Sequence, residues 1–249
     1  SLLFIPLSQI LDPPFTSAFL RIPLLFLSFV SSPSFSPFFV LRRPPCRAGQ
    51  PRRIGARGRS PRIYFFSPSA YAIRMLSIAI NGCGRIGRHA LKIIRELADA
   101  KVVAVNDLTD PSTLAHLVRH DTVYRAYHRS VAVEDGALAI DGERFPVFAE
   151  KDPAKLPWGK LGVDIVLECT GRFTERAAAE AHLKAGAKRV VLSAPGKGND
   201  IPTFVMGVND AALTGREPVI SNASCTTNCL APMMAVMQAA FGIQKSLMT

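Results

Sequence analysis

Short apolar runs alternate with amphipathic stretches from residue 75 onward, a pattern typical of βαβ units on a mostly parallel sheet. Strands are expected where the runs are short and mostly apolar, at residues 76–81, 101–106, 164–168, 189–193, 203–208 and 218–221. Helices are expected where apolar residues recur every three to four positions, at residues 85–98, 111–120, 174–185 and 226–241. The pattern therefore predicts the α/β class, with helices on both faces of the sheet.

One segment departs from this alternation. Residues 131–149 show the apolar and polar alternation of half-buried strands, and Asp-Gly pairs at 135–136 and 141–142 are typical of tight hairpin turns. We expect an antiparallel insertion there, followed by a connecting loop over residues 151–162.

The first 74 residues have a different composition. They hold ten arginines, one acidic residue and 11 of the 19 prolines, so most of the net charge of +11 lies there. Because prolines interrupt its apolar stretches, this basic Pro/Ser/Phe-rich segment is expected to be disordered and to contain no membrane span. No methionine precedes Met75, which favours a mis-assigned start or a fragment over a targeting segment.

Charge and cysteine content limit the partners and the compartment. The pI near 9.9 reflects the N-terminal segment, so nucleic-acid binding is not favoured for the nearly neutral remainder. Five cysteines in no paired pattern indicate reduced thiols and a cytoplasmic protein. An organelle is the alternative if residues 1–74 are a transit peptide.

Residues 82–87 read Gly-Cys-Gly-Arg-Ile-Gly, the glycine pattern of dinucleotide-binding loops, and Asp107 follows 20 positions later. A strand is predicted before the motif and a helix after it. Gly82 would allow the tight turn, Gly84 the approach of the pyrophosphate, and Gly87 close helix–strand packing. Asp107 would bind ribose hydroxyls and repel a 2′-phosphate, which favours NAD over NADP. The motif predicts a Rossmann-type domain, and a glycine turn without cofactor is the alternative.

Cys225 stands where the last predicted strand gives way to the last helix. Unpaired N–H groups and the positive end of a helix dipole favour a thiolate at such a turn, so Cys225 is a candidate nucleophile. A buried structural thiol is the alternative, which the polar neighbours Ser224 and Thr226 disfavour. Cys229 lies one turn further on and is interpreted as a structural neighbour, and no metal site is predicted.

Five motifs together resemble phosphorylating glyceraldehyde-3-phosphate dehydrogenases. They lie in order at residues 81–88, 106–108, 170–174, 193–195 and 221–232. The resemblance covers residues 75–249, roughly the first half of that family's chain. It implies an NAD-binding domain over residues 75–224 and, over residues 225–249, the start and first helix of a truncated catalytic domain.

The resemblance also implies roles for individual residues. The pyrophosphate is expected at Arg85 and Ile86, the adenosine ribose at Asp107, and the rest of the cofactor at Lys151, Thr170, Gly171 and Ser193. Cys225 would form a thiohemiacetal and a thioester, while Ser224 and Thr226 would bind substrate or inorganic phosphate. The implied reaction is the glycolytic, NAD-dependent oxidative phosphorylation of glyceraldehyde 3-phosphate, and the implied assembly of the complete enzyme is a homotetramer.

Two alternatives to this reaction remain open, namely erythrose-4-phosphate dehydrogenase and a non-catalytic NAD-binding module. In the family a histidine downstream of the cysteine accepts its proton. The five histidines here all precede Cys225 and are expected to be surface or helix residues. The truncated chain is therefore expected to react at Cys225 without completing a turnover. Cys83 replaces a usual phenylalanine, and residues 124–128 depart from the family pattern.

Overall fold

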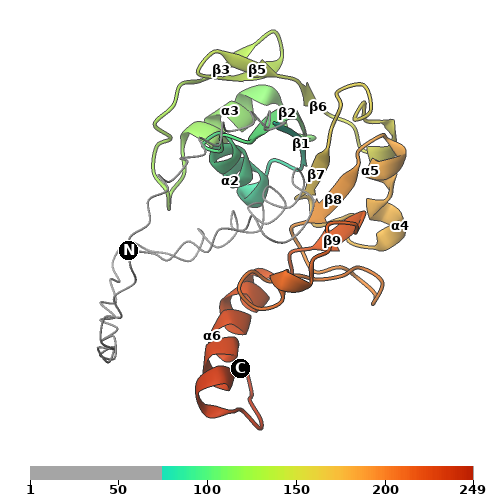
Figure 1. The fold of residues 1–249 in the computed structure, drawn as a ribbon. Helices are drawn as coiled ribbons and strands as arrows, with labels where there is room; N and C mark the ends of the chain where they lie inside the picture. The colour runs from blue at the N-terminus through green and yellow to red at the C-terminus, as the bar shows by residue number, and fades with distance from the viewer. Residues whose placement is uncertain (1–74, 249) are drawn as a thin grey trace, which may run out of the picture. The chain divides into compact units, whose positions relative to one another are not determined.

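The computed structural model describes residues 75–248, and the predicted disorder of residues 1–74 lies outside these described residues. Six strands form the main sheet: β1 (Leu76–Asn81), β2 (Ala100–Asn106), β6 (Val147–Phe148), β7 (Ile165–Glu168), β8 (Arg189–Leu192) and β9 (Val219–Ser221). Their order is β6-β2-β1-β7-β8-β9, and every neighbouring pair is parallel (Figure 1). The predicted α/β class and mostly parallel sheet are confirmed.

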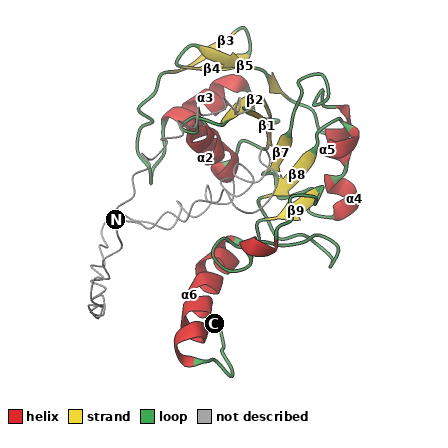
Figure 2. Ribbon diagram, viewed as in Figure 1, coloured by secondary structure: helices red, strands yellow, loops and turns green. Residues whose placement is uncertain are grey.

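Within the described residues, four helices cover the two faces of this sheet (Figure 2). They are α2 (Arg85–Ile94), α3 (Pro111–Arg119), α4 (Arg176–Ala179) and α5 (Ala181–Lys184), with single 3-10 turns at Pro153–Lys155 and Asp210–Ala212. The last helix, α6 (Cys225–Phe241), extends away from the sheet. Alternate residues of β1 belong to different cores: Ile78 and Ile80 pack with α2 and α3, whereas Ala79 packs with Trp158. Burial on both faces explains why the strands are almost wholly apolar.

The predicted insertion forms a separate antiparallel sheet of β3 (Val131–Glu134), β4 (Ala137–Ile140) and β5 (Glu143–Phe145). Asp135 and Asp141 take positive φ values of 48° and 51° at its two hairpin turns, as the Asp-Gly pairs predict. The insertion is shorter than expected, because β6 pairs in parallel with β2 instead. Pro146 breaks the run after β5, since a proline has no N–H to continue the ladder.

Two helices are shorter in the structure than predicted. The helix expected to reach residue 98 ends at Ile94, because the N–H groups of Glu96 and Leu97 bond three residues back and turn the chain toward β2. The helix expected over residues 174–185 begins later, because Glu175 forms an isolated parallel bridge with Lys197. It is also divided at Glu180 into α4 and α5.

The prediction of a strand over residues 203–208 is wrong. Only Thr203 bridges to Ser221, and the segment then turns. The Asn209 side chain causes this turn, because its Oδ1 accepts from the Val205 N–H at 2.7 Å and its Nδ2 donates to the Thr203 carbonyl at 2.9 Å. A side-chain amide thus takes the backbone groups that a strand would have used.

The last helix, α6, differs from the others because none of its residues is buried. It begins one residue earlier than predicted and exposes an apolar stripe of Met233, Val236, Met237 and Phe241. Within residues 75–248, no helix has the length and apolarity needed to cross a bilayer.

Candidate functional site

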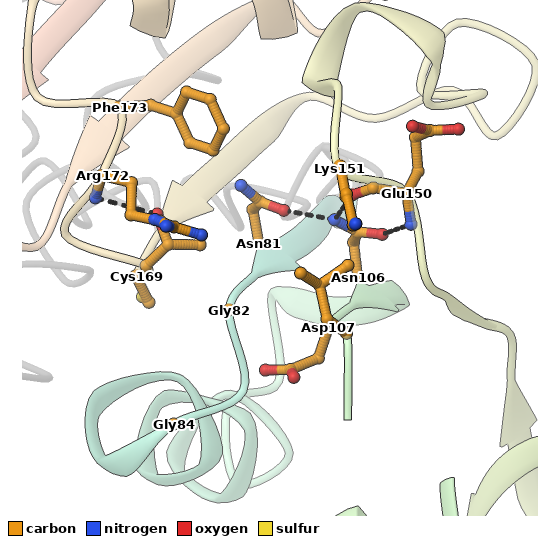
Figure 3. Close-up of a pocket in the computed structure, with 12 residues that line it drawn as sticks. Asn81, Gly82, Gly84, Asn106, Asp107, Glu150, Lys151, Cys169, Arg172 and Phe173 are labelled. Atoms are coloured by element: carbon orange, nitrogen blue, oxygen red, sulfur yellow. Dashed lines mark hydrogen bonds between the residues drawn. The ribbon is translucent and has the colours of Figure 1, made fainter. Parts of the chain in front are cut away.

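A cavity of about 650 Å³ opens at the carboxyl ends of β1, β2 and β7 (Figure 3). Its lining residues are Asn81, Gly82, Gly84, Asn106, Asp107, Leu108, Glu150, Lys151, Cys169, Thr170, Arg172 and Phe173. The chain proceeds from β1 to β2 on one side and later places β7 on the other side of β1, so the cavity lies where the strand order reverses. Open α/β sheets bind ligands at this switch point.

The cavity brings together half of the residues predicted to bind cofactor. Gly82, Gly84, Asp107, Lys151 and Thr170 line it. The other five, which are Arg85, Ile86, Gly87, Gly171 and Ser193, are not among its lining residues. Arg85 instead borders a second cavity of about 320 Å³ together with residues that include Arg88, His89 and Asp121. The roles of all ten residues stay predictions.

The three motif glycines occupy three different environments. Gly82 has a φ of +89°, and a Cβ there would lie 2.8 Å from the Thr170 backbone nitrogen. A Cβ at Gly87 would lie 1.9 Å from the Gly82 carbonyl oxygen, whereas a Cβ at Gly84 would meet no atom within 4 Å. Gly82 and Gly87 are therefore required by packing, and the open space at Gly84 leaves a cradle of the kind that a pyrophosphate needs.

Asp107 is held in place by backbone donors at the end of β2. Its Oδ2 accepts from the Cys83 N–H at 2.6 Å and its Oδ1 from the Thr109 N–H at 2.8 Å. Each carboxylate oxygen keeps a second lone pair for a ligand hydroxyl. Figure 3 shows Asp107 on the cavity wall near Gly82 and Gly84, the geometry expected for an acid that binds ribose.

An Asp107→Asn variant is expected to bind NAD about tenfold more weakly and to lose most of its preference for NAD over NADP. The substitution removes the charge that repels a 2′-phosphate, and hydrogen bonds to charged groups contribute about 1.5–3 kcal/mol. Titration calorimetry with each dinucleotide measures both effects. Asp135→Asn is the matched control, because Asp135 is an exposed carboxylate paired with Arg144. An unchanged NAD to NADP ratio in Asp107→Asn would contradict the assignment.

A buried polar network that the sequence analysis missed lies beneath the cavity. Asn106 donates to Asn81 at 2.6 Å, Asn81 donates to Glu168 at 2.5 Å, and Glu168 contacts His182 at 3.1 Å. Trp158 completes it by donating to His182 Nδ1 at 3.0 Å. His182 is on a helix as expected, yet it is fully buried rather than a surface residue. The available signal was that Asn81, Asn106 and Glu168 each close an apolar strand at the same sheet edge.

Cys225 is the first residue of α6, and the turn of residues 222–224 connects it to the end of β9. Ser224 caps the helix, because its hydroxyl accepts from the Thr227 N–H at 2.9 Å. Ala223 takes a φ of +61°, which is strained for a residue with a Cβ, and its N–H donates to the Ser221 hydroxyl. The turn thus fixes an exposed thiol where unpaired helical N–H groups gather, as predicted.

Cys225 and the cavity lie on the same edge of the sheet. All six strands are parallel, so their carboxyl ends meet at one edge, and β8 separates β7 from β9 in the strand order. Ser193 directly follows β8, and its N–H donates to the Glu168 carbonyl at 3.0 Å. Ser224, Cys225 and Thr226 do not line the cavity. The edge therefore presents the cavity, Ser193 and Cys225 in that order.

Two other cysteines are chemically unlike Cys225. Burial, reinforced by the Asp107 charge, raises the pKa of Cys83 to about 12. Burial of its thiol also raises the pKa of Cys169 to about 12. Cys83 is fully within the core around β1 and α2. Both thiols are therefore protonated packing residues.

These raised pKa values predict a loss of stability in alkali. The native thiols keep their protons while the unfolded chain loses them above about pH 9, so the free energy of unfolding falls as pH rises toward 12. The loss should reach roughly 1 kcal/mol per thiol at pH 10. Urea denaturation of Cys83→Ala should show a shallower pH dependence than the unmodified chain. Cys229→Ala, which removes an exposed thiol, should keep the original slope.

Comparisons with known proteins agree with this geometry. The family model described as glyceraldehyde 3-phosphate dehydrogenase, NAD binding domain, matches residues 76–176, and the model of the C-terminal domain matches residues 224–249. Glyceraldehyde-3-phosphate dehydrogenase of Clostridium pasteurianum is 55% identical over 175 residues, covering 70% of this chain and 52% of that relative. The protein of that name from Geobacillus stearothermophilus is 51% identical over 175 residues, covering 70% of this chain and 52% of that relative. The one from Thermotoga maritima is 50% identical over 177 residues, covering 70% of this chain and 53% of that relative.

The fold and the cavity at its switch point define a dinucleotide-binding domain of the dehydrogenase type. The chain belongs to the glyceraldehyde-3-phosphate dehydrogenase family, and its cofactor is NAD. It spans about half the length of the curated relatives it matches. Among residues 75–248, no group of three or more histidine, cysteine or acidic side chains is placed to hold a metal ion.

Proposed function

We propose that this chain provides the cofactor site and the nucleophile of an enzyme that oxidises and phosphorylates glyceraldehyde 3-phosphate to 1,3-bisphosphoglycerate. The observation that carries this proposal is the order of features along the sheet edge. The NAD cavity, Ser193 and the exposed Cys225 follow one another at the ends of adjacent strands. A cofactor whose adenosine lies at Asp107 can then extend along the edge toward Cys225.

The residues of the cavity fit the dinucleotide. Gly84 leaves room for the pyrophosphate, and Asp107 offers free lone pairs to a ribose. The Lys151 and Thr170 positions in the lining support their proposed roles, while Arg85, Ile86, Gly171 and Ser193 are proposed to contact the cofactor outside it. When bound, NAD supplies the hydride acceptor for the oxidation.

The residues at the start of α6 are suited to covalent chemistry. The Cys225 thiolate would attack the aldehyde carbon and form a thiohemiacetal. Loss of a hydride from that carbon and of the hydroxyl proton would give a thioester, and attack by inorganic phosphate would then transfer the acyl group and release the Cys225 thiolate. The hydroxyls of Ser224 and Thr226, 2.8 Å apart, lie beside Cys225 and would hold a phosphate oxygen. The helix N-terminus adds N–H groups that favour anions.

The relatives' names support glyceraldehyde 3-phosphate over erythrose 4-phosphate as the substrate, because the matched proteins carry the former name. We also propose a homotetramer for the complete protein, supported by the family resemblance. A cytoplasmic location is proposed because the four cysteines among the described residues are free thiols.

Two measurements test the proposed function. Titration calorimetry should detect NAD binding to the folded chain, and absorbance should then follow NADH formed from aldehyde phosphate and inorganic phosphate. NADH formation that depends on phosphate and is faster with glyceraldehyde 3-phosphate than with erythrose 4-phosphate supports the proposal. Because the chain is expected to react at Cys225 without completing a turnover, NAD binding together with a covalent aldehyde adduct at Cys225, detected by mass spectrometry, also supports it. NAD binding with neither NADH nor an adduct at Cys225 would support the non-catalytic module instead. A folded chain that binds no NAD would overturn the proposal.

A further inference from the structure

The buried network beneath the cavity centres on the carboxylate of Glu168, which is only 1% exposed. Its Oε1 accepts from the Thr170 N–H at 2.8 Å and from the Thr170 hydroxyl, and its Oε2 accepts from Asn81 Nδ2 and contacts His182 Nε2. Every lone pair of this carboxylate thus has a donor in reach. Within the described part of the chain, its one ion-pair contact is His182 rather than a lysine or an arginine.

The hydrogen bonds around Glu168 have a fixed direction. The Trp158 indole can only donate, so His182 Nδ1 accepts and the histidine proton must be on Nε2, which donates to Glu168. The Thr170 hydroxyl accepts from the Arg172 N–H at 3.1 Å, which leaves its proton for Glu168. Both groups are therefore oriented as donors by their other partners.

On the other side of Glu168, the hydrogen bonds of Asn81 and Asn106 also run toward its carboxylate. The Asn106 Oδ1 accepts from the Glu150 N–H at 2.9 Å, so its Nδ2 donates to the Glu150 carbonyl and to Asn81 Oδ1. This orientation leaves Asn81 Nδ2 to donate to Glu168. Figure 3 shows the Asn81, Asn106 and Glu150 part of this chain across the base of the cavity.

The network joins the two walls of the cofactor cavity. One wall is the loop of residues 169–173, and the other is the segment of residues 150–151. The Thr170 loop lies directly against the glycine turn, because its backbone nitrogen is 2.8 Å from the position of a Gly82 Cβ. A small movement of this loop would therefore change the width of the cavity next to the dinucleotide motif.

We propose that Glu168 is a positioning residue that fixes these two walls at the separation that admits the adenosine half of NAD. It acts through Thr170 on one wall and through Asn81 and Asn106 on the other. This inference rests on the proposed function, since Asp107 assigns the adenosine half to the same cavity. A glutamine cannot replace Glu168, because its NH₂ group would oppose two donors that are themselves fixed.

The test compares Glu168→Gln with the unmodified chain in two measurements. Calorimetry with ADP-ribose should show a dissociation constant raised about tenfold, as expected when buried donors lose their acceptor. Hydrogen exchange should be at least about tenfold faster for the amides of Thr170, Arg172 and Glu150, while the amides of β1 remain protected. Glu175→Gln is the matched control, because Glu175 is exposed and pairs only at 3.7 Å with Lys197.

A second variant keeps the inference testable if Glu168→Gln does not fold. Thr170→Val keeps the side-chain shape but removes the hydroxyl that donates to Glu168, and it should raise the ADP-ribose dissociation constant about threefold. A Glu168→Gln or Thr170→Val protein with lower stability but unchanged exchange and affinity would overturn the positioning role. Failure of the unmodified chain to bind NAD would overturn the proposed function, while the exchange rates would still decide the role of Glu168.

Discussion

A Gly87→Ala variant is expected to lose at least about 4 kcal/mol of unfolding free energy, or to fail to fold. The new Cβ would lie 1.9 Å from the Gly82 carbonyl oxygen and 3.1 Å from Ile80 Cγ2. The first contact is with the backbone of the turn, so it can be relieved only by moving α2 away from β1. Alanine normally favours a helix over glycine by about 1 kcal/mol, which is too little to offset such an overlap. Urea denaturation followed by circular dichroism measures the change.

Gly84→Ala is the matched control for this prediction. Gly84 has a φ of −71°, and a Cβ there would meet no atom within 4 Å. Its unfolding free energy should therefore change by less than about 1 kcal/mol. Its affinity for NAD should fall, because the methyl group enters the space left for the pyrophosphate. Equal midpoints for Gly87→Ala and the unmodified chain would contradict the packing argument.

The parallel core was predictable because its strands are apolar on both faces. Ile78, Ala79 and Ile80 are all fully buried, so the run in β1 is continuous rather than alternating. The glycine motif then placed the first turn and helix, because Gly82 and Gly87 occupy positions where packing excludes a Cβ. The local sequence is therefore sufficient to predict an element where residues nearby in the chain set both its burial and its backbone geometry.

The segment at residues 203–208 shows where local pattern stops being sufficient. Phe204 and Val205 are 7% and 5% exposed, so the apolar pattern correctly indicated burial. It could not indicate that Asn209 would capture the backbone groups of Thr203 and Val205. Burial is encoded by the residues themselves, whereas the choice between a ladder and a turn depended here on one side-chain amide.

The buried polar network beneath the cavity was even harder to predict from the sequence. Glu168 meets Asn81 from 87 positions away and His182 from 14 positions away. No local pattern signals such contacts, because they arise only when parallel strands end at a common edge. Five of the ten residues predicted to bind the cofactor line the cavity, while the hydrogen bonds that orient its walls are found only in the folded chain.

Iodoacetamide is expected to modify Cys225 at least about a hundredfold faster than Cys83 or Cys169. Burial raises the pKa of both of those thiols from 9.0 to about 12, which lowers their thiolate population roughly a thousandfold near neutral pH. Cys225 is exposed at the start of α6, so the reagent can reach its sulfur directly. Peptide mapping by mass spectrometry over a time course measures each rate separately.

Comparing the reaction rates of Cys225 and Cys229 separates the effect of exposure from the effect of position in α6. Both thiols are exposed, but Cys229 lies one turn into α6, where the effect of the helix N-terminus has largely decayed. Cys225 should therefore react faster than Cys229 by a factor of about three to ten. Cys225→Ser should remove the fast reaction, and Cys229→Ser should leave it intact. A fast reaction that survives in Cys225→Ser and maps to Cys229 would show that exposure alone governs reactivity, and the proposed nucleophile would lose its physical basis.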